Sequence, residues 1–230
     1  HLINALKRKE IKIFTPKRNI DLRKIDAWNT FEESDVVIHL AAKTSVEDSW
    51  KDPQHYINTN TLITTNVLEY CRKYKSKLIL LSSYLYGNPK TLPISENFET
   101  IALNPYALSK LLTEETCKFY RNYFGIETII LRVFNIYGPF QPKGFLISKI
   151  IKQVEDLKTI KVNCLTPKRD YLYIDDLIDA IIKAIYYKGN KYLFNIGFGK
   201  SHSVKEIISI IQKIYSTNLP VVDLKLKRKL

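Results

Sequence analysis

Lys77-Leu78-Ile79-Leu80-Leu81-Ser82 places four apolar residues in a row, and long amphipathic stretches lie on either side of it, at Gln54 to Tyr74 and Pro105 to Tyr123. Strands of a parallel sheet read as short continuous apolar runs, because helices cover both faces of such a sheet. The same alternation predicts further strands at Ile11 to Thr15, Asp35 to Leu40, Glu127 to Phe134 and Tyr192 to Ile196. We therefore predict an α/β fold with a doubly wound parallel sheet.

The alternation fails between Tyr137 and Lys168, where turns rich in Pro and Gly surround one helical run at Phe145 to Leu157. It resumes with helical patterns at Asp175 to Tyr187 and Val204 to Tyr215. Irregular excursions from a doubly wound sheet usually build the lobe that covers a ligand. We therefore predict a sheet domain over residues 1–138 and 171–198, and a small substrate lobe over residues 139–170 and 199–230.

The composition, with 45% hydrophobic and 26% charged residues among 230, is that of a globular chain that can bury its own core. No apolar run approaches the roughly 20 residues of a membrane span, and residues 1–30 lack a signal-peptide core. We therefore expect a cytoplasmic protein with no membrane partner. The three cysteines, Cys71, Cys117 and Cys164, lack metal-ligand or redox spacing, so we predict buried thiols and no metal site.

The net charge is +13, but the basic residues are scattered. One dense run is present, at Lys225, Lys227, Arg228 and Lys229. This distribution favours a solvated lysine-rich surface over a nucleic-acid footprint, so we predict no nucleic-acid partner. A basic surface also suits an anionic nucleotide ligand.

The segment Asn104-Pro105-Tyr106-Ala107-Leu108-Ser109-Lys110 begins a predicted helix and places Tyr106 and Lys110 on one face of it. A tyrosine that acts as a base at pH 7 must lose about 3 units from a pKa near 10. One positive charge ~4 Å away, at an effective dielectric constant near 20, supplies about the 4 kcal/mol required. The alternative is a packed tyrosine beside a lysine that extends along the helix to solvent.

A second motif, Ser82-Ser83-Tyr84-Leu85-Tyr86-Gly87, lies at the carboxyl end of a buried strand, where open α/β sheets place their ligands. A serine hydroxyl there can hydrogen-bond the substrate oxygen whose proton the tyrosine moves. The two motifs together therefore favour a catalytic interpretation over a structural one.

Together these motifs resemble the extended short-chain dehydrogenase/reductase family, the NAD(P)-dependent nucleotide-sugar epimerases, dehydratases and reductases. The likeness covers nearly the whole chain, and it implies that the sheet domain is a Rossmann-like dinucleotide-binding domain. Four more segments are similar to family motifs in order and spacing: Asp35 to Ala42, Asn60 to Glu69, Leu131 to Pro139 and Arg169 to Asp176. The family's first strand and its glycine-rich, pyrophosphate-binding turn do not occur in this sequence, and its carboxyl end looks short, so we expect a chain truncated at both ends.

The resemblance assigns the catalytic roles residue by residue. Tyr106 is the implied acid/base, and Lys110 its partner and a ligand of the cofactor ribose. Ser82 is the implied hydroxyl, because the family's hydroxyl lies four residues before the position of Tyr86; Ser83 is its substitute. His39 has no implied role and is interpreted as a packed strand histidine.

The same resemblance predicts the substrate-binding residues. Asn135 and Arg169 are expected to bind the substrate's pyrophosphate, a role that suits an amide donor and a planar guanidinium. The alternatives are a turn residue for Asn135 and an ion pair with Asp170 for Arg169. Ser83 and Tyr84 are expected to contact the substrate as well.

The predicted cofactor is NADP or NAD. The segment that corresponds to the family's second strand ends in Thr15-Pro16-Lys17-Arg18. It has no carboxylate to bind the adenosine ribose hydroxyls, as NAD-binding members have, so the prediction favours NADP. Solvated loop charges are the alternative interpretation of Lys17 and Arg18. The residues that the resemblance assigns to the cofactor are Arg18, Asp21, Leu22, Leu40, Ala41, Ala42, Lys43, Asn60, Tyr106 and Lys110.

One motif points to a different class of protein. Gly197-Phe198-Gly199-Lys200-Ser201 lies between a predicted strand and a predicted helix, as a phosphate-binding P-loop does. The P-loop motif requires a glycine where this chain has Phe194, so an NTPase is disfavoured.

Two residues limit which reactions of the family this chain can be expected to catalyse. Family dehydratases follow the catalytic hydroxyl with an Asp-Glu pair, whereas this chain has Ser83 and Tyr84, so dehydration is disfavoured. We predict a 4-epimerase of a UDP-sugar that works through a 4-keto intermediate. The alternatives are an NADPH-dependent 4-keto-sugar reductase and an inactive nucleotide-binding or scaffold relative. The resemblance also implies a homodimer through the helices that carry Asn60 and Tyr106.

Overall fold

The computed structural model describes residues 1–89 and 91–226, so Lys227 to Lys229 of the terminal basic run lie outside the described residues. Its contacts divide the chain into two compact units. Unit 1 comprises His1–Val133 and Ile178–Ile196, and unit 2 comprises Phe134–Leu177 and Gly197–Leu230. The chain thus changes units after residues 133, 177 and 196; the predicted boundaries at residues 138, 170 and 198 stay predictions.

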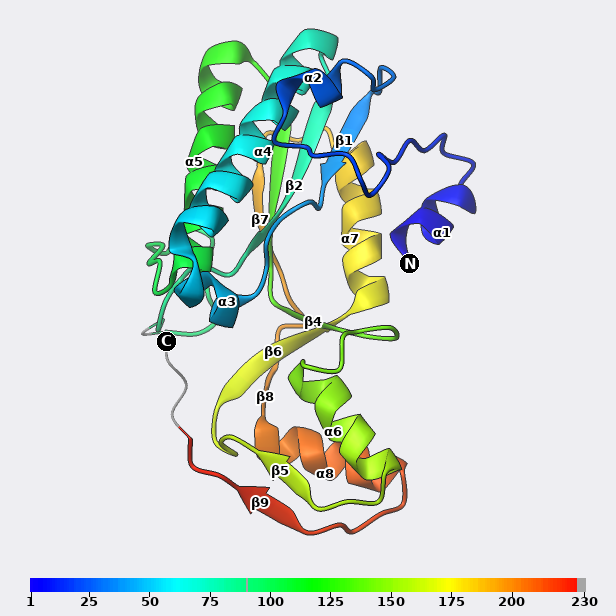
Figure 1. Cartoon of the computed structure of the whole chain (residues 1–230), viewed down its shortest axis with the longest axis vertical. Helices are drawn as coiled ribbons and strands as arrows, with labels where there is room; N and C mark the ends of the chain where they lie inside the picture. The colour runs from blue at the N-terminus through cyan, green and yellow to red at the C-terminus, as the bar shows by residue number, and fades with distance from the viewer. Residues whose placement is uncertain (90, 227–230) are drawn as a thin grey trace. The chain divides into compact units, whose positions relative to one another are not determined.

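Unit 1 is built on a four-stranded parallel sheet in the order β1-β2-β3-β7. Its strands are β1 (Val36–His39), β2 (Lys77–Ser83), β3 (Thr128–Val133) and β7 (Leu193–Ile196). Helices α4 (Pro53–Tyr74) and α5 (Pro105–Phe124) lie side by side on one face, and α7 (Ile174–Tyr186) lies on the other (Figure 1). All strands therefore end at the same edge of the sheet, where a doubly wound fold places its ligand site.

The apolar runs become the centre of this sheet, as the sequence predicts. Leu78, Ile79 and Leu80 of β2 have no exposed surface, and every residue of β3 is buried. Residues from α4, α5, β2 and β3 meet in one core, among them Leu68, Cys71, Cys117, Leu80 and Ile130. Cys71 and Cys117 are thus buried free thiols, as predicted, whereas Cys164 is only partly buried.

Helix α5 begins where its sequence predicts. The Asn104 side chain accepts a hydrogen bond from the Ala107 amide at 2.8 Å, and Pro105 takes the first helical position, where no amide hydrogen is needed. The helix ends at Gly125, whose φ of 65° is the left-handed conformation that glycine adopts without strain. This start places Tyr106 and Lys110 in the first two turns of α5.

The segment from Ile11 to Thr15 is not a strand, contrary to the prediction. In the doubly wound order a second strand pairs with a first strand, and no strand precedes Ile11 in the described part of the chain. Without that neighbour the segment's backbone has no ladder to join. Unit 1 also contains three short helices, α1 (Leu2–Lys7), α2 (Ile25–Trp28) and α3 (Val46–Lys51).

A buried lysine fastens the start of β2 to the end of α7. The Lys77 ammonium donates to the carbonyl of Tyr187 at 2.6 Å and to that of Ile185 at 3.3 Å, and it pairs with Glu127 at 2.9 Å. Carbonyls at a helix end have no partner within the helix, and a cation there satisfies them and complements the helix dipole. Lys77 therefore acts as the cap of α7.

Unit 2 consists of short strands and two helices. In it, β6 (Lys168–Tyr173) pairs with β4 (Asn135–Tyr137) in parallel and with β8 (Ser201–Ser203) in antiparallel orientation. A second parallel pair is formed by β5 (Ile160–Val162) and β9 (Val221–Asp223). Helices α6 (Leu146–Glu155) and α8 (Val204–Ile214) supply a core that includes Ile150, Val154, Ile207, Ile208 and Ile211.

In the residues that the structure describes, no helix combines the length and the apolar character that a transmembrane segment needs.

Candidate active site

Tyr106 lies in the first turn of α5 and is hydrogen-bonded to the Ser83 side chain at the end of β2. Burial raises the pKa of the phenol, and the hydrogen bond with Ser83 only partly opposes this effect. The phenol is therefore protonated at neutral pH in this structure. The protonated phenol can donate a proton. It can accept one only as the phenolate, which a nearby cation would stabilise.

The two adjacent serines occupy different environments, because successive side chains of a strand point to opposite faces. Ser83 contacts the Tyr106 phenol. The Ser82 hydroxyl is buried and has no hydrogen-bond partner within the described part of the chain. The preference for Ser82 over Ser83 thus does not match the contact to Tyr106, and the catalytic role of either hydroxyl stays a prediction.

Lys110 is buried one turn after Tyr106, with 5% of its surface exposed. Its ammonium donates to the carbonyl oxygen of Leu81 at 2.6 Å, which holds it at the carboxyl end of β2. Burial lowers its pKa to about 8. The sequence predicts that this charge lowers the pKa of Tyr106, whereas in the structure burial is the largest influence on the phenol and raises its pKa.

His39, at the end of β1, is a neutral packed residue. Burial, assisted by the positive charge of Lys110, lowers its pKa to about 3. The Thr64 hydroxyl donates to the carbonyl of Asn60 at 2.8 Å, so at the 3.1 Å contact between His39 Nε2 and Thr64 Oγ1 the ring nitrogen is the donor. The histidine thus packs between β1 and α4, in keeping with the structural interpretation.

Asn60 of α4 holds the turn after β1 against α5. Its Oδ1 accepts from the Lys43 amide at 2.8 Å, and its Nδ2 donates to the Lys43 carbonyl at 3.1 Å and to Ser109 Oγ at 2.8 Å. Ser109 Oγ donates in turn to the Tyr106 carbonyl at 2.7 Å. The side-chain amide therefore positions both the turn from Leu40 to Lys43 and the first turn of α5.

The predicted cofactor residues nearer the amino terminus are Arg18, Asp21 and Leu22, of which Asp21 and Leu22 make contacts of their own. Arg18 is exposed. The guanidinium of Arg23 forms two hydrogen bonds of 2.8 Å with the Asp21 carboxylate and lowers the pKa of that carboxyl to about 2. The Leu22 carbonyl accepts from Trp28 Nε1 at 2.9 Å, which fixes the backbone beside Asp21. The sequence did not predict the pairing with Arg23.

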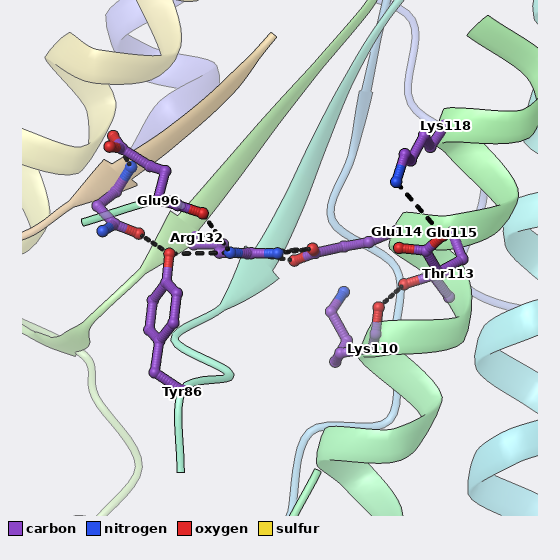
Figure 2. A network of polar contacts seen from close by, with 9 residues as sticks. Tyr86, Glu96, Lys110, Thr113, Glu114, Glu115, Lys118 and Arg132 are labelled. Atoms are coloured by element: carbon purple, nitrogen blue, oxygen red, sulfur yellow. Dashed lines mark hydrogen bonds and ion pairs between the residues drawn. The ribbon is translucent and has the colours of Figure 1, made fainter. Parts of the chain in front are cut away.

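A buried polar network next to Lys110 was also missed by the sequence analysis (Figure 2). Arg132 of β3 donates to both carboxylate oxygens of Glu114 at 2.7 to 3.1 Å, and to the Tyr86 hydroxyl at 2.9 Å. Tyr86 donates to Asn195 Oδ1 of β7 at 2.6 Å. The available signal was Arg132 itself, since a charged residue in a fully buried strand requires a partner.

The predicted pyrophosphate residues lie on adjacent strands of unit 2, β4 and β6. Asn135 Nδ2 donates to the Asp170 carbonyl at 2.9 Å, and Arg169 Nη1 donates to the Lys168 carbonyl at 2.8 Å. The Asp170 carboxylate accepts from the backbone amides of Phe198 and Gly199 at 2.8 and 2.7 Å.

These contacts decide two alternatives from the sequence. Asp170 uses both carboxylate oxygens on backbone amides, so the ion pair with Arg169 does not form in the structure. The same contacts occupy the amides of Phe198 and Gly199, which a P-loop would need for phosphate.

The model of the NAD dependent epimerase/dehydratase family matches residues 1–197 of this chain. The chain belongs to this family. Its members are NAD(P)-dependent enzymes that act on nucleotide sugars as epimerases or reductases. This result confirms the predicted family and, with the parallel sheet of unit 1, the predicted fold class.

Three similar proteins illustrate the range of the family. A putative UDP-glucose 4-epimerase of Methanocaldococcus jannaschii is 38% identical over 203 residues, which are 84% of this chain and 66% of that protein. The structure of UDP-glucuronic acid 4-epimerase from Bacillus cereus, with UDP-glucuronic acid and NAD, is 33% identical with a TM-score of 0.80 over 97% of this chain and 73% of that one. RMD from Pseudomonas aeruginosa, solved with NADPH, is 26% identical with a TM-score of 0.88, over 99% and 83%. The chain spans about two thirds of the length of the curated relatives it matches.

Proposed function

We propose that the protein is a nucleotide-sugar 4-epimerase, with a UDP-sugar as substrate, that oxidises and re-reduces the sugar carbon C4. The observation that carries this proposal is the contact between the Tyr106 phenol and the Ser83 side chain at the carboxyl end of β2, with buried Lys110 one turn away. The same three residue types in this order are what the family resemblance implies for proton transfer to a sugar oxygen. Family membership supports the substrate class.

The residues at this edge of the sheet fit a nicotinamide dinucleotide. The Lys110 ammonium uses one donor on Leu81 in a buried site, and a ribose hydroxyl is a suitable acceptor for another. The Ser82 hydroxyl is buried without a partner in the described residues, as expected of a group that a ligand satisfies. A bound NAD(P) would supply the hydride chemistry at C4, as the acceptor when the carbon is oxidised and as the donor when it is reduced again.

The chain's own residues move the proton in this reaction. Tyr106 accepts the proton of the C4 hydroxyl as the carbon is oxidised, and it donates that proton back as the ketone is reduced, so protons balance over the cycle. Lys110 supplies the positive charge that stabilises the phenolate between these steps. Ser83 orients the phenol through their hydrogen bond. On unit 2, we propose that Asn135 and Arg169 bind the pyrophosphate of the substrate.

The test is the interconversion of UDP-glucose and UDP-galactose by the full-length protein and by its Tyr106→Phe variant. Loss of the acid/base is expected to lower kcat by about 10²- to 10⁴-fold. Tyr123→Phe is the matched control, because Tyr123 lies on the same helix and is 73% exposed. Full turnover by Tyr106→Phe would refute the mechanism. Failure of the full-length protein to bind a nicotinamide dinucleotide would support the inactive binding relative.

A 4-keto-sugar reductase is the second candidate, and the exposed basic pair Lys17-Arg18 favours it, because these charges suit the extra phosphate of NADP. We propose NADP over NAD on the same ground. A reductase consumes one NADPH for each 4-keto sugar reduced, whereas an epimerase turns over with no net consumption of cofactor. Absorbance at 340 nm during turnover, together with the Kd of each cofactor, distinguishes these cases.

The homodimer stays a prediction. Helices α4 and α5 pack side by side and leave three leucines substantially exposed, Leu62, Leu108 and Leu112. Exposed apolar residues on a helix pair suit burial against a second copy. Light scattering of the full-length protein measures the mass in solution.

A further inference from the structure

Three ionisable residues lie on one face of α5 at intervals of four: Tyr106, Lys110 and Glu114. Side chains four residues apart on a helix are neighbours, and a Lys and a Glu at this spacing ordinarily attract each other. Here both are buried, with 5% and 3% of their surface exposed, where an ion needs a counter-ion most. A buried ion pair between Lys110 and Glu114 is therefore the default expectation.

The structure shows a different pairing. Arg132 donates to Glu114 Oε2 from Nη2 at 2.7 Å and from Nε at 3.0 Å, and to Oε1 from Nε at 3.1 Å. The Lys110 ammonium donates to the carbonyl of Leu81. Figure 2 shows the Glu114 carboxylate directed toward the Arg132 guanidinium. The Glu114 carboxylate is thus bound by Arg132 of β3.

Arg132 is fixed from its other side as well. Its Nη1 donates to the Tyr86 hydroxyl at 2.9 Å and to the Glu96 carbonyl at 3.4 Å, and its guanidinium lies 5.0 Å from the centre of the Tyr86 ring. The Tyr86 hydroxyl donates to Asn195. A planar guanidinium held on two sides binds a carboxylate in a fixed geometry that an ammonium cannot reproduce.

The other groups around Lys110 do not replace this counter-ion. On β1, His39 is neutral, because burial and the charge of Lys110 lower its pKa to about 3. On α5, burial raises the pKa of the Cys117 thiol, and burial likewise raises that of Tyr106, so both are neutral. Within the described residues, Glu114 is the carboxylate whose charge acts on Lys110.

We propose that Arg132 is a positioning residue that withholds Glu114 from Lys110, so that the positive charge and the donors of the ammonium stay available to the Tyr106 phenolate and the cofactor. This inference rests on the proposed function. If Glu114 paired with Lys110, its negative charge would offset the positive charge that stabilises the Tyr106 phenolate. Arg132 touches neither substrate nor cofactor in this scheme and acts only through Glu114.

The decisive comparison is between Arg132→Met and the double variant Arg132→Met/Glu114→Leu. The single variant frees Glu114 to pair with Lys110, whereas the double variant removes both the guanidinium of Arg132 and the carboxylate of Glu114. Replacing both members of a buried pair by apolar residues is often neutral for stability, while breaking the pair is not. If Arg132 had only a structural role, removing Glu114 as well would not return the pKa of Lys110 to its native value.

The first readout is the titration of Lys110 by NMR in protein labelled at lysine Cε, with its resonance assigned by loss in Lys110→Met. We expect a midpoint near 8 in the native protein and at least about one pH unit higher in Arg132→Met, because a paired ammonium holds its proton more tightly. The double variant is expected to return to the native midpoint. An unchanged midpoint in a folded Arg132→Met protein would overturn the proposal.

The second readout is the pH profile of kcat for the full-length protein. In Arg132→Met the acidic limb is expected to move to higher pH and kcat at pH 7 to fall about tenfold, since a shift of one pKa unit changes the phenolate fraction tenfold. The double variant is expected to recover most of this loss. If it stays as impaired as the single variant, the inference fails.

Two outcomes separate this inference from the proposed function. A native protein that turns over no nucleotide sugar contradicts the proposed function, whereas the Lys110 titration is measured without turnover and judges Arg132 alone. If Arg132→Met does not fold, the pair Arg132→Gln and Arg132→Gln/Glu114→Gln gives the same comparison. Glutamine at position 132 keeps a donor for Tyr86, so that contact is preserved.

Discussion

The two ends of strand β2 each hold a buried lysine, and the two lysines are satisfied to different degrees. At the start of the strand, Lys77 donates to two carbonyls at the end of α7 and pairs with Glu127. At the other end, Lys110 donates to the Leu81 carbonyl and has no carboxylate partner among the residues that the structure describes, because Arg132 binds Glu114. Lys77 stabilises the fold, whereas Lys110 retains hydrogen-bond donors and a positive charge that a ligand can use. Such incompletely satisfied buried groups are typical of functional positions.

The largest effect expected from this comparison is on activity at the carboxyl end. Lys110→Met is expected to lower kcat by about 10²-fold or more, because the Tyr106 phenolate loses its cation. The melting temperature is expected to hold or rise, since the variant removes a buried charge that lacks a counter-ion. Steady-state kinetics and thermal unfolding of the same preparation check both. A large drop in stability would show that Lys110 is structural, as Lys77 is.

The next effect is on the pH dependence of stability. The pKa of Lys110 is about 8 in the folded chain against 10.5 for a free lysine, so between these values the unfolded chain binds more protons and stability rises with pH. From pH 8 to pH 9.5 we expect the free energy of unfolding to gain about 2 kcal/mol relative to Lys110→Met. Urea unfolding at the two pH values measures this gain. Parallel curves for both proteins would contradict it.

An effect of similar size on stability is expected at the start of β2. Lys77→Met leaves the carbonyls of Ile185 and Tyr187 without their donor and is expected to lower the free energy of unfolding by about 1–3 kcal/mol. Activity is expected to persist, because the change lies at the opposite end of the strand from Tyr106. Urea unfolding with parallel turnover assays tests this, and a variant that is stable but inactive would remove the distinction between the two ends.

The smallest effect serves as the control for Lys77. Glu127 is its exposed partner, with 57% of the side chain accessible to solvent. Exposed members of ion pairs contribute little, so Glu127→Gln is expected to cost less than about 1 kcal/mol. A larger cost by urea unfolding would mean that the ion pair, rather than the helix carbonyls, anchors Lys77.

Much of unit 1 could be predicted from sequence because its signals are local. The apolar run at β2 and the capped start of α5 depend on neighbouring residues alone, and both appear in the structure at the expected places. The segment from Ile11 to Thr15 has the composition of a strand but no neighbour to pair with. Strand formation depends on that distant neighbour, which composition does not report.

The site itself was only partly predictable. Tyr106 and Lys110 share a helix, so their common face follows from spacing. Which of Ser82 and Ser83 faces the phenol depends on how β2 meets α5, and a shift of one residue reverses it. The pairing of Glu114 with Arg132 joins a helix to a strand 18 residues away, and no local pattern announces such a partner. The strands of unit 2 escaped prediction because several have only three residues.

Asn60 ties the dynamics of an exposed turn to those of a buried helix. The Lys43 amide lies in a surface turn, yet its hydrogen is held by Asn60 Oδ1, and Asn60 is 2% exposed within α4. That hydrogen can exchange with solvent only after it leaves Asn60 Oδ1, and the Asn60 side chain is also held by Ser109 of α5. We therefore expect the turn after β1 to exchange its amide hydrogens more slowly than an ordinary surface loop does.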